Sequence, residues 1–384
     1  MSRRAVSAVT HWGFVLTGVA TTMLGPLLPA LAAQWTLSDE RAGYLFAAQF
    51  LGVLASTLGC VQLSRRVGFQ EILAAGFGCM ALGVLALGTS DWWLGLAAAA
   101  VWGAGTGLVA PASNLLVAAT AAKQSPAAAL NVLNMLWGVG AVSAPVLIAT
   151  VLRVSGVAAF SRGFAVVLAA TALAAWLLRA KPREASAHRA AHATATAAPP
   201  AGSITALTAA FLFLYVGVEA GISGWLPSFT MRAFRLGAGE RALVQSIFWG
   251  AFLAGRLLAP WLLKKISTSR LIVLGTALSF AALVTVLLSS RLPLILAGTG
   301  LAGAGLAAIY PTAIAIYCAR YAVSPPPHAG LVFAAGSLGG AFLPWLVGAV
   351  STGFQSLRAG MALPLACLLV MLAVQLRLGR RERY

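Results

Sequence analysis

The amino-acid sequence predicts an all-α membrane protein with twelve transmembrane helices arranged in two pseudo-symmetric six-helix bundles. The chain of 384 residues is 60% hydrophobic and only 9% charged, whereas charged residues make up about 25% of an ordinary soluble domain. Its apolar stretches are long enough to cross ~30 Å of hydrocarbon as helices, which takes about 20 residues each. A repeat with an offset of about 200 residues divides these stretches into two similar halves.

Twelve predicted spans follow one another along the chain. The first is too long, and too poor in small-residue cleavage motifs, to be a secretory signal peptide, so we expect it to be retained. Seven of the eight Asp and Glu residues lie at span ends, in loops or in tails, where we expect water to reach them. The predicted spans cover residues 5–33, 39–61, 71–88, 91–121, 126–152, 160–178, 203–230, 240–263, 269–289, 292–319, 328–351 and 355–376.

Residues 179–202, between the sixth and seventh spans, are rich in Ala, Thr and Pro and carry scattered charges. Such a composition neither spans a membrane nor packs into a core, which indicates a flexible cytoplasmic linker. We therefore expect an amino-terminal bundle over residues 1–178 and a carboxy-terminal bundle over residues 203–384.

The two halves repeat each other at matched points. Six-helix halves that run in the same direction through the membrane are related by an axis along the membrane normal, and solute binds between such halves near mid-depth. Pro111 and Pro311 each remove a backbone donor, so we expect them to bend spans four and ten. The matched segments are Glu40–Ala42 with Glu240–Ala242, Gly103–Gly105 with Gly303–Gly305, and Pro111 with Pro311.

The formal net charge of +18 is better explained by membrane orientation than by a nucleic-acid partner. Most of the 26 Lys and Arg residues lie in short segments on one side of the predicted spans. Cytoplasmic segments carry such an excess, so we expect an inner-membrane protein with both termini in the cytoplasm. Its expected partners are the lipid bilayer, a small solute and protons, and we expect a monomer.

Glu219 is the one acid placed near the middle of an apolar span. An ionisable side chain at bilayer depth costs at least ~2.5 kcal/mol on insertion scales, and such residues usually face a partner or a wet cavity. The residue 200 positions earlier is Val19, so the acid is not an architectural feature common to both halves. Glu219 is our candidate proton-coupling residue, and the alternative is an acid held neutral by its neighbours as a packing contact.

Further solute-binding candidates lie on spans seven and eight. Tyr215 is one helical turn before Glu219 and shares its face. Trp225 lies in an outer end interrupted by Gly and Pro, which suits a hinge or gate. Gln245 and Trp249 fall on one stripe of span eight.

Arg256 continues that stripe and is a candidate gating or structural residue. At 1.5 Å per residue it lies roughly 10 Å from Glu219 in depth, so we do not expect the two to pair directly. The alternative is a residue that snorkels towards the cytoplasmic side or ties helix ends together.

Spans two, four, five and ten add polar and aromatic candidates. Asn131 and Asn134 lie one turn apart and offer the carboxamide donors and acceptors that recognise the hydroxyl groups of a neutral solute. The alternative is interhelical hydrogen bonding, worth only ~0.6 kcal/mol per bond on average. The remaining solute-binding candidates are Trp137, Asn114, Gln49 and Tyr310.

Enzymatic motifs are not evident in the sequence. The glycine runs lack the Gly-Lys-Ser/Thr ending of a nucleotide-binding loop and lie inside spans. No metal-ligand cluster and no Ser-His-Asp arrangement stands out, so we expect no enzyme activity, no metal and no cofactor.

The loop after span two reads Val61-Gln-Leu-Ser-Arg-Arg-Val-Gly68. With the two-half repeat and the central linker, it makes the chain similar to a major facilitator superfamily transporter over nearly its whole length. The superfamily's pattern at this loop is Gly-x-Leu-Ala-Asp-Arg-x-Gly. Arg66 and Gly68 match it, whereas Arg65 replaces the aspartate of the usual charge-locked inner gate. Arg66 is accordingly a gating or structural candidate.

Three motifs narrow this resemblance to the fucose, galactose and glucose proton symporter group. In fucose permease the acids credited with coupling and substrate binding lie on spans one and four, and the positions aligned with them here are Gly25 and Ala110. If protons are coupled, Glu219 is the obvious carrier, since desolvation favours the protonated form of a carboxylic acid. The motifs are Tyr215–Glu219 with Gly224-Trp225, Tyr310–Thr312, and Gly336–Gly340 with Pro344.

We therefore expect a secondary active transporter, working by alternating access, for a small neutral polar solute such as a sugar or polyol. Proton symport would be coupled through Glu219. One alternative is efflux of amphiphilic drug-like or lipid-like compounds, indicated by the many aromatic residues and by the Gly138–Pro145 pattern. The other is a non-transporting membrane sensor with the same fold.

Overall fold

The computed structural model describes residues 3–64, 66–89, 91–120, 126–179, 202–319 and 328–381. These residues are organised as α-helices joined by short connections. Most of the predicted linker, residues 180–201, and Arg65 lie outside the described residues. The helices are α1 (Arg3–Thr22), α2 (Leu24–Gln34), α3 (Asp39–Ser64), α4 (Phe69–Leu87), α5 (Trp92–Thr120), α6 (Pro126–Leu177), α8 (Ser203–Phe234), α9 (Ala238–Leu262), α10 (Thr268–Leu288), α11 (Leu292–Leu306), α12 (Ile309–Ala319), α13 (Ala329–Phe354) and α14 (Leu357–Arg381).

The helices follow the predicted spans closely. Ten helices in the described ranges are long and apolar enough to cross a membrane, and the pair α1 and α2, bent by 46°, raises the number of spans to as many as eleven. α6 is a continuous run of 52 residues that contains both predicted span five and predicted span six. Its backbone leaves helical geometry at Gly156, where φ is 75°, and this break separates the two spans. Glycine adopts such a positive φ without steric cost. Counting α6 as two spans gives twelve for the described part of the chain, and the predicted fold class is confirmed.

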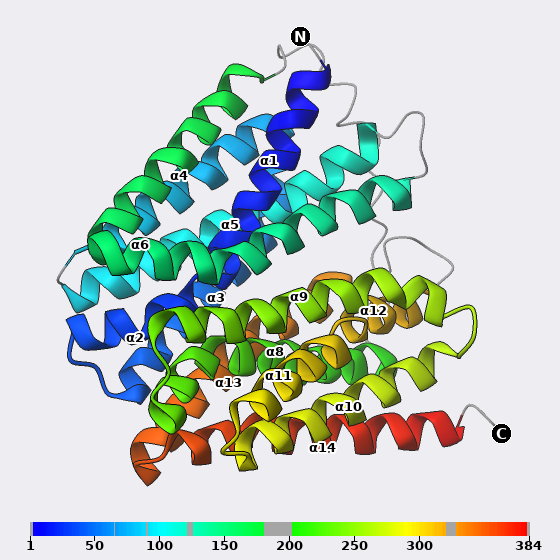
Figure 1. Ribbon diagram of the computed structural model, residues 1–384. Coiled ribbons are helices and arrows are strands. Elements are labelled where there is room, and N and C mark those ends of the chain that lie inside the picture. Colours follow the sequence, from blue (N-terminus) through cyan, green and yellow to red (C-terminus); the bar gives the residue numbers. More distant parts are fainter. Residues whose placement is uncertain are drawn as a thin grey trace. The chain divides into compact units, whose positions relative to one another are not determined.

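The chain forms two compact units. The first contains residues 1–35 and 48–198, and the second contains residues 36–47 and 199–384. In the first unit α4 packs against α5 and α6, and α1 packs against α6; in the second, α10 packs against α11 and α14, and α8 packs against α13 (Figure 1). The helix pairs correspond in chain order, so each unit repeats one packing plan.

Matched glycines make matched backbone contacts in the two units. A Cβ atom added at Gly103 would collide with the backbone of Gln49, and one added at Gly303 would collide with the backbone of Phe248. Small residues let helix backbones approach this closely in membrane proteins. The repeated Gly-Ala-Gly segments therefore allow close backbone packing of α5 on α3 in the first unit and of α11 on α9 in the second.

We predict that Gly339→Ala destabilises the second unit by about 1–3 kcal/mol, the usual cost of overpacking. An added Cβ there would collide with the backbone carbonyl of Phe213, so α8 and α13 would have to separate. Gly353→Ala in the same helix is the matched control, since nothing lies within 4 Å of its Cβ position. Thermal unfolding of the purified protein measures both, and an unchanged midpoint for Gly339→Ala would contradict the close helix contact.

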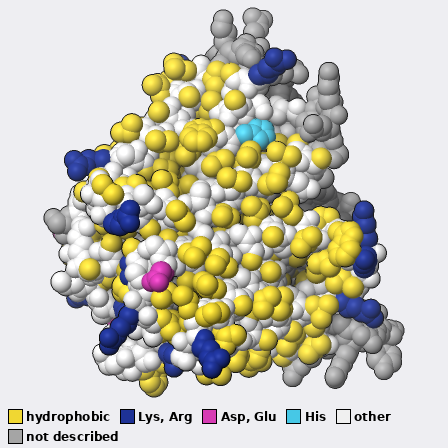
Figure 2. Space-filling model, in the orientation of Figure 1, with side chains coloured by type: hydrophobic (Ala, Val, Ile, Leu, Met, Phe, Trp, Pro, Cys, Tyr) yellow, Lys and Arg dark blue, Asp and Glu magenta, His cyan; other side chains and the backbone are white. Residues whose placement is uncertain are grey.

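The surface of the described residues is apolar over wide areas. Large side chains such as Leu82, Leu177 and Leu288 are 66%, 67% and 76% exposed. Figure 2 shows hydrophobic side chains spread over the face in view, with Lys and Arg side chains at scattered points. Exposed apolar surface of this extent marks a membrane or interaction surface, and here it fits helices that face lipid.

Candidate functional site

Four predicted site residues come together in the second unit. Tyr215 and Glu219 lie on α8, Arg256 on α9 and Tyr310 on α12 (Figure 1). The Tyr215 and Glu219 side chains interact with each other, and the Arg256 guanidinium interacts electrostatically with both. The Tyr215 and Tyr310 ring centroids are 5.8 Å apart. Tyr215 is buried, whereas Glu219 keeps intermediate exposure.

Arg256 interacts electrostatically with Glu219, although the two residues lie at different depths along their helices. The depth comparison refers to backbone positions, and an arginine side chain extends well beyond its own turn of helix. Its guanidinium carbon lies 4.5 Å from the centroid of the Phe252 ring, and its Nε donates a hydrogen bond to the Ala307 carbonyl oxygen at 3.3 Å. The interaction between Arg256 and Glu219 is electrostatic, and the expectation that the two do not pair directly stays a prediction.

The Arg256 contact falls where predicted span ten is interrupted. α11 ends at Leu306 and α12 begins at Ile309. Pro311 has no N–H group, so it leaves the carbonyl four residues earlier, that of Ala307, without its helical donor. Arg256 supplies a donor to this carbonyl, and the Tyr215 hydroxyl donates to the neighbouring Leu306 carbonyl oxygen at 3.0 Å.

The matching proline in the first unit has a matching contact. Pro111 leaves the Gly107 carbonyl without a helical donor, and the Thr57 hydroxyl donates to it at 3.2 Å. α5 nevertheless runs through Pro111 as one helix, so a proline alone does not interrupt the span. Thr57 and Arg256 thus fill equivalent gaps, one with a neutral group and the other with a cation.

Gln245 and Trp249 extend the cluster along α9. Gln245 is 1% exposed; its Nε2 donates to the Ser223 carbonyl oxygen at 3.0 Å, and its Oε1 has no partner within the described residues. The Trp249 ring packs edge-on against the Phe252 ring at 5.3 Å. An unsatisfied buried amide oxygen costs free energy, so Gln245 has an acceptor available for a hydroxyl group.

Trp225 has a packing contact rather than an open face. It is fully buried, and its indole Nε1 donates to the Pro344 carbonyl oxygen at 2.8 Å. The bond joins α8 to α13 at the point where Pro344 lies inside α13. Trp225 therefore forms a contact between α8 and α13.

In the first unit, the predicted α6 candidates differ in exposure. Asn131 and Asn134 are exposed, and the Asn134 Nδ2 donates to the Leu130 carbonyl oxygen of its own helix at 2.8 Å. The Trp137 indole donates to the Thr21 hydroxyl on α1 at 3.0 Å. The asparagines therefore present carboxamides at the unit's surface, whereas Trp137 joins two helices.

The remaining first-unit candidates are spread over separate helices. Asn114 is half-buried and donates from Nδ2 to the Ala110 carbonyl oxygen of its own helix at 2.8 Å. Gln49 is 4% exposed. Arg66 is exposed and follows the end of α3. These three side chains do not form a cluster like that of the second unit.

A half-buried ion pair between α3 and α8 was not anticipated from the sequence. Asp39 is only 9% exposed, although we expected water to reach it. Both of its carboxylate oxygens accept hydrogen bonds from Arg232 at 2.6 Å, and Oδ2 also accepts one from the Ser351 hydroxyl at 2.6 Å. The partners lie 193 and 312 residues away in the sequence, so no local pattern reveals them. The nearest sequence signal is the neighbouring Glu40, which matches Glu240 in the repeat and does not indicate the Arg232 contact.

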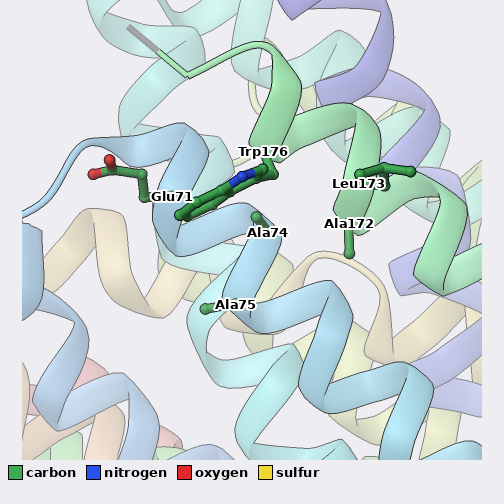
Figure 3. A pocket seen from close by; sticks show the side chains of 6 residues that line it. All are labelled: Glu71, Ala74, Ala75, Ala172, Leu173 and Trp176. Carbon is green, nitrogen blue, oxygen red and sulfur yellow. The ribbon is translucent and has the colours of Figure 1, made fainter. Parts of the chain in front are cut away.

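A hollow of about 360 Å³ lies between α4 and α6 of the first unit, and Figure 3 shows the side chains that line it. The Trp176 indole extends from α6 towards α4 in this view, and the walls are mostly apolar. Glu71, its one acid, accepts a hydrogen bond from the Gly68 amide at the start of α4. None of the predicted site residues lines this hollow, which comprises Glu71, Ala74, Ala75, Ala172, Leu173 and Trp176.

The fold and the cluster define the class of the protein. It is a multi-pass α-helical membrane protein whose two units repeat one packing plan, with an ionisable group inside one of them. The family model of the Major Facilitator Superfamily matches residues 10–287. The chain belongs to this superfamily, which comprises transporters.

Three similar proteins cover nearly the whole chain. The glucose/mannose transporter GlcP of Bacillus subtilis (strain 168) is 24% identical over 391 residues, covering 96% of this chain and 94% of GlcP. A bacterial homologue of the human lysosomal transporter Spinster, in an inward-facing, unoccupied conformation, superposes with a TM-score of 0.78 at 16% identity, covering 98% of this chain and 97% of its own. The superfamily transporter FucP, in an outward conformation, superposes with a TM-score of 0.63 at 18% identity, covering 96% and 97%.

Proposed function

We propose that this protein is a proton-coupled secondary transporter of a sugar or another small neutral polyhydroxylated solute. The observation that carries the proposal is the second-unit cluster, in which Glu219 interacts electrostatically with Arg256 and lies on the same helix face as Tyr215. A carboxyl group there binds or releases one proton without leaving the span. Such intramembrane acids mark proton relays and substrate pathways in transporters.

The chemistry of the candidate side chains supports a solute rich in hydroxyl groups. Gln245 has a buried amide oxygen that no donor in the described part of the chain reaches, and Asn131 and Asn134 present carboxamides. Tyr310 and Trp249 add aromatic faces on which a sugar ring packs. The similarity to a glucose/mannose transporter over 96% of the chain points to the same class of solute.

We also propose the cellular arrangement that follows from the charge pattern. Both termini lie in the cytoplasm, the inner membrane holds the chain, and the bundles of residues 1–178 and 203–384 alternate in exposing a site to the two sides. The working unit is a monomer. Labelling of single cysteines at Ser2 and Tyr384 with an impermeant reagent in intact cells tests the orientation, since neither position should react before lysis.

A thermal-shift screen of the purified protein tests the solute class. Sugars, polyols and amphiphilic drugs are compared at acid and neutral pH. A ligand at 100 times its Kd stabilises the folded protein by about 2.7 kcal/mol, so a bound hexose raises the midpoint by several degrees. Uptake of that hexose into proteoliposomes, driven by an inward proton gradient, completes the test. Stabilisation by amphiphilic compounds alone would support the efflux alternative, and hexose binding without flux would support a sensor.

A further inference from the structure

We infer that Tyr215 and Arg256 transmit the protonation state of Glu219 to the break between α11 and α12. Their side chains supply the donors for two consecutive carbonyl groups at that break, those of Leu306 and Ala307. Both side chains also interact with Glu219. The inference rests on the proposed proton coupling and adds the step by which a bound proton changes the backbone of span ten.

The argument for Tyr215 follows from the number of its hydrogens. A phenol group has one hydrogen to donate, and in the structure it points to the Leu306 carbonyl oxygen. The contact between Tyr215 and Glu219 is then a hydrogen bond only when Glu219 supplies the hydrogen, which requires the protonated carboxyl. When Glu219 loses its proton to water, the carboxylate becomes the stronger acceptor for the Tyr215 hydrogen, because charge-assisted hydrogen bonds are about twice as strong as neutral ones. The Leu306 carbonyl then loses its donor.

The argument for Arg256 follows from its counterpart in the first unit. Thr57 fills the equivalent gap left by Pro111, so a neutral hydroxyl is sufficient for the structural task. In the second unit the donor to the freed carbonyl is the cation Arg256. Arg256 interacts with Glu219, and the residue that corresponds to Glu219 in the first unit is the apolar Val19. An ionised Glu219 attracts the guanidinium away from the Ala307 carbonyl, whereas a neutral Glu219 leaves it there.

The ionisable groups that face Glu219 are few. Within the described residues they are Tyr215 on the same helix, Arg256 on α9 and Tyr310 on α12. α13, which packs along α8, carries no Asp, Glu, Lys, Arg, His, Cys or Tyr. α14 also packs on α8, and its ionisable residues are Arg358, Cys367 and the arginines near its end. Among the described residues, Arg256 is therefore the cation that interacts with Glu219.

Hydrogen–deuterium exchange of the full chain tests the inference without a solute. After correction for intrinsic exchange, the amides between residues 306 and 312, of which Pro311 has none, should exchange about fivefold faster in the wild type at neutral than at acid pH for each hydrogen bond released, equivalent to about 1 kcal/mol. Glu219→Gln should exchange slowly at both pH values, because a neutral carboxamide does not capture the donors. Tyr215→Phe should exchange faster than the wild type at acid pH, because the Leu306 carbonyl has lost its donor.

Thr57→Val is the matched control. It should speed exchange near Gly107 at both pH values and leave amides 306–312 and their pH response unchanged. A wild type whose amides 306–312 show no pH response, or a Glu219→Gln variant that retains it, would overturn the inference. Proton-driven sugar uptake with no such response would leave the proposed function standing without this step, whereas the response without sugar uptake would refute the solute and keep the step.

Discussion

Glu219→Gln should abolish accumulation of the solute against its gradient while sparing exchange of solute across the membrane. Glutamine keeps the size and hydrogen-bonding groups of the protonated acid but neither binds nor releases a proton. With one proton per solute, a pH difference of two units supplies about 2.7 kcal/mol, enough for ~100-fold accumulation. The variant should reach a ratio of about one in proteoliposomes, and its counterflow of labelled solute should continue.

The matched control for Glu219 is another acid with a known structural task. Glu240 accepts a hydrogen bond from the Gly237 amide at the start of α9, so Glu240→Gln should weaken a helix start and leave the accumulation ratio intact. Undiminished accumulation by Glu219→Gln would assign the coupled proton to another group and leave Glu219 as a packing residue.

Asp39→Leu should be the most destabilising change of a charged residue outside the candidate site. It removes the acceptor for Arg232 and for the buried Ser351 hydroxyl. Breaking a fully buried ion pair costs 3–5 kcal/mol, but the Arg232 side chain is 46% exposed and regains water. We therefore expect a loss of about 2 kcal/mol, measured by thermal unfolding, with faster amide exchange in residues 39–47.

Glu40→Gln provides the control for Asp39. Glu40 is adjacent to Asp39, carries the same charge and lies in the same first turn of α3. Its interaction with the helix dipole is therefore of similar strength. Its backbone amide donates to the Thr352 hydroxyl, and this bond survives the substitution. Equal effects of the two variants would show that charge at the helix start, rather than the Arg232 contact, stabilises the segment.

The span pattern was predictable because membrane helices obey a length rule. Every predicted span corresponds to helical residues in the structure, since apolar stretches of about 20 residues have no other way to satisfy their backbone groups in hydrocarbon. The local breaks were less predictable. Pro111 and Pro311 look alike in sequence, yet only the second lies beside an interruption.

The candidate site was partly predictable. Tyr215 and Glu219 share a helical face by spacing alone, whereas the position of Arg256 depended on how far a long side chain extends. Asp39 was expected to be hydrated because sequence position at a span end says nothing about Arg232, which folds against it from 193 residues away. Buried polar pairs between distant segments leave no local periodic signal, so only coordinates reveal them.

The paired roles of Thr57 and Arg256 bear on how the two halves of the chain diverged. If both descend from one duplicated ancestor, each inherited a backbone gap that any hydrogen-bond donor fills. That tolerance allowed one copy to exchange a neutral filler for a charged one without rebuilding the helix. A site of this kind acquires sensitivity to pH through two substitutions, an arginine and a nearby acid, while the other copy keeps its neutral donor.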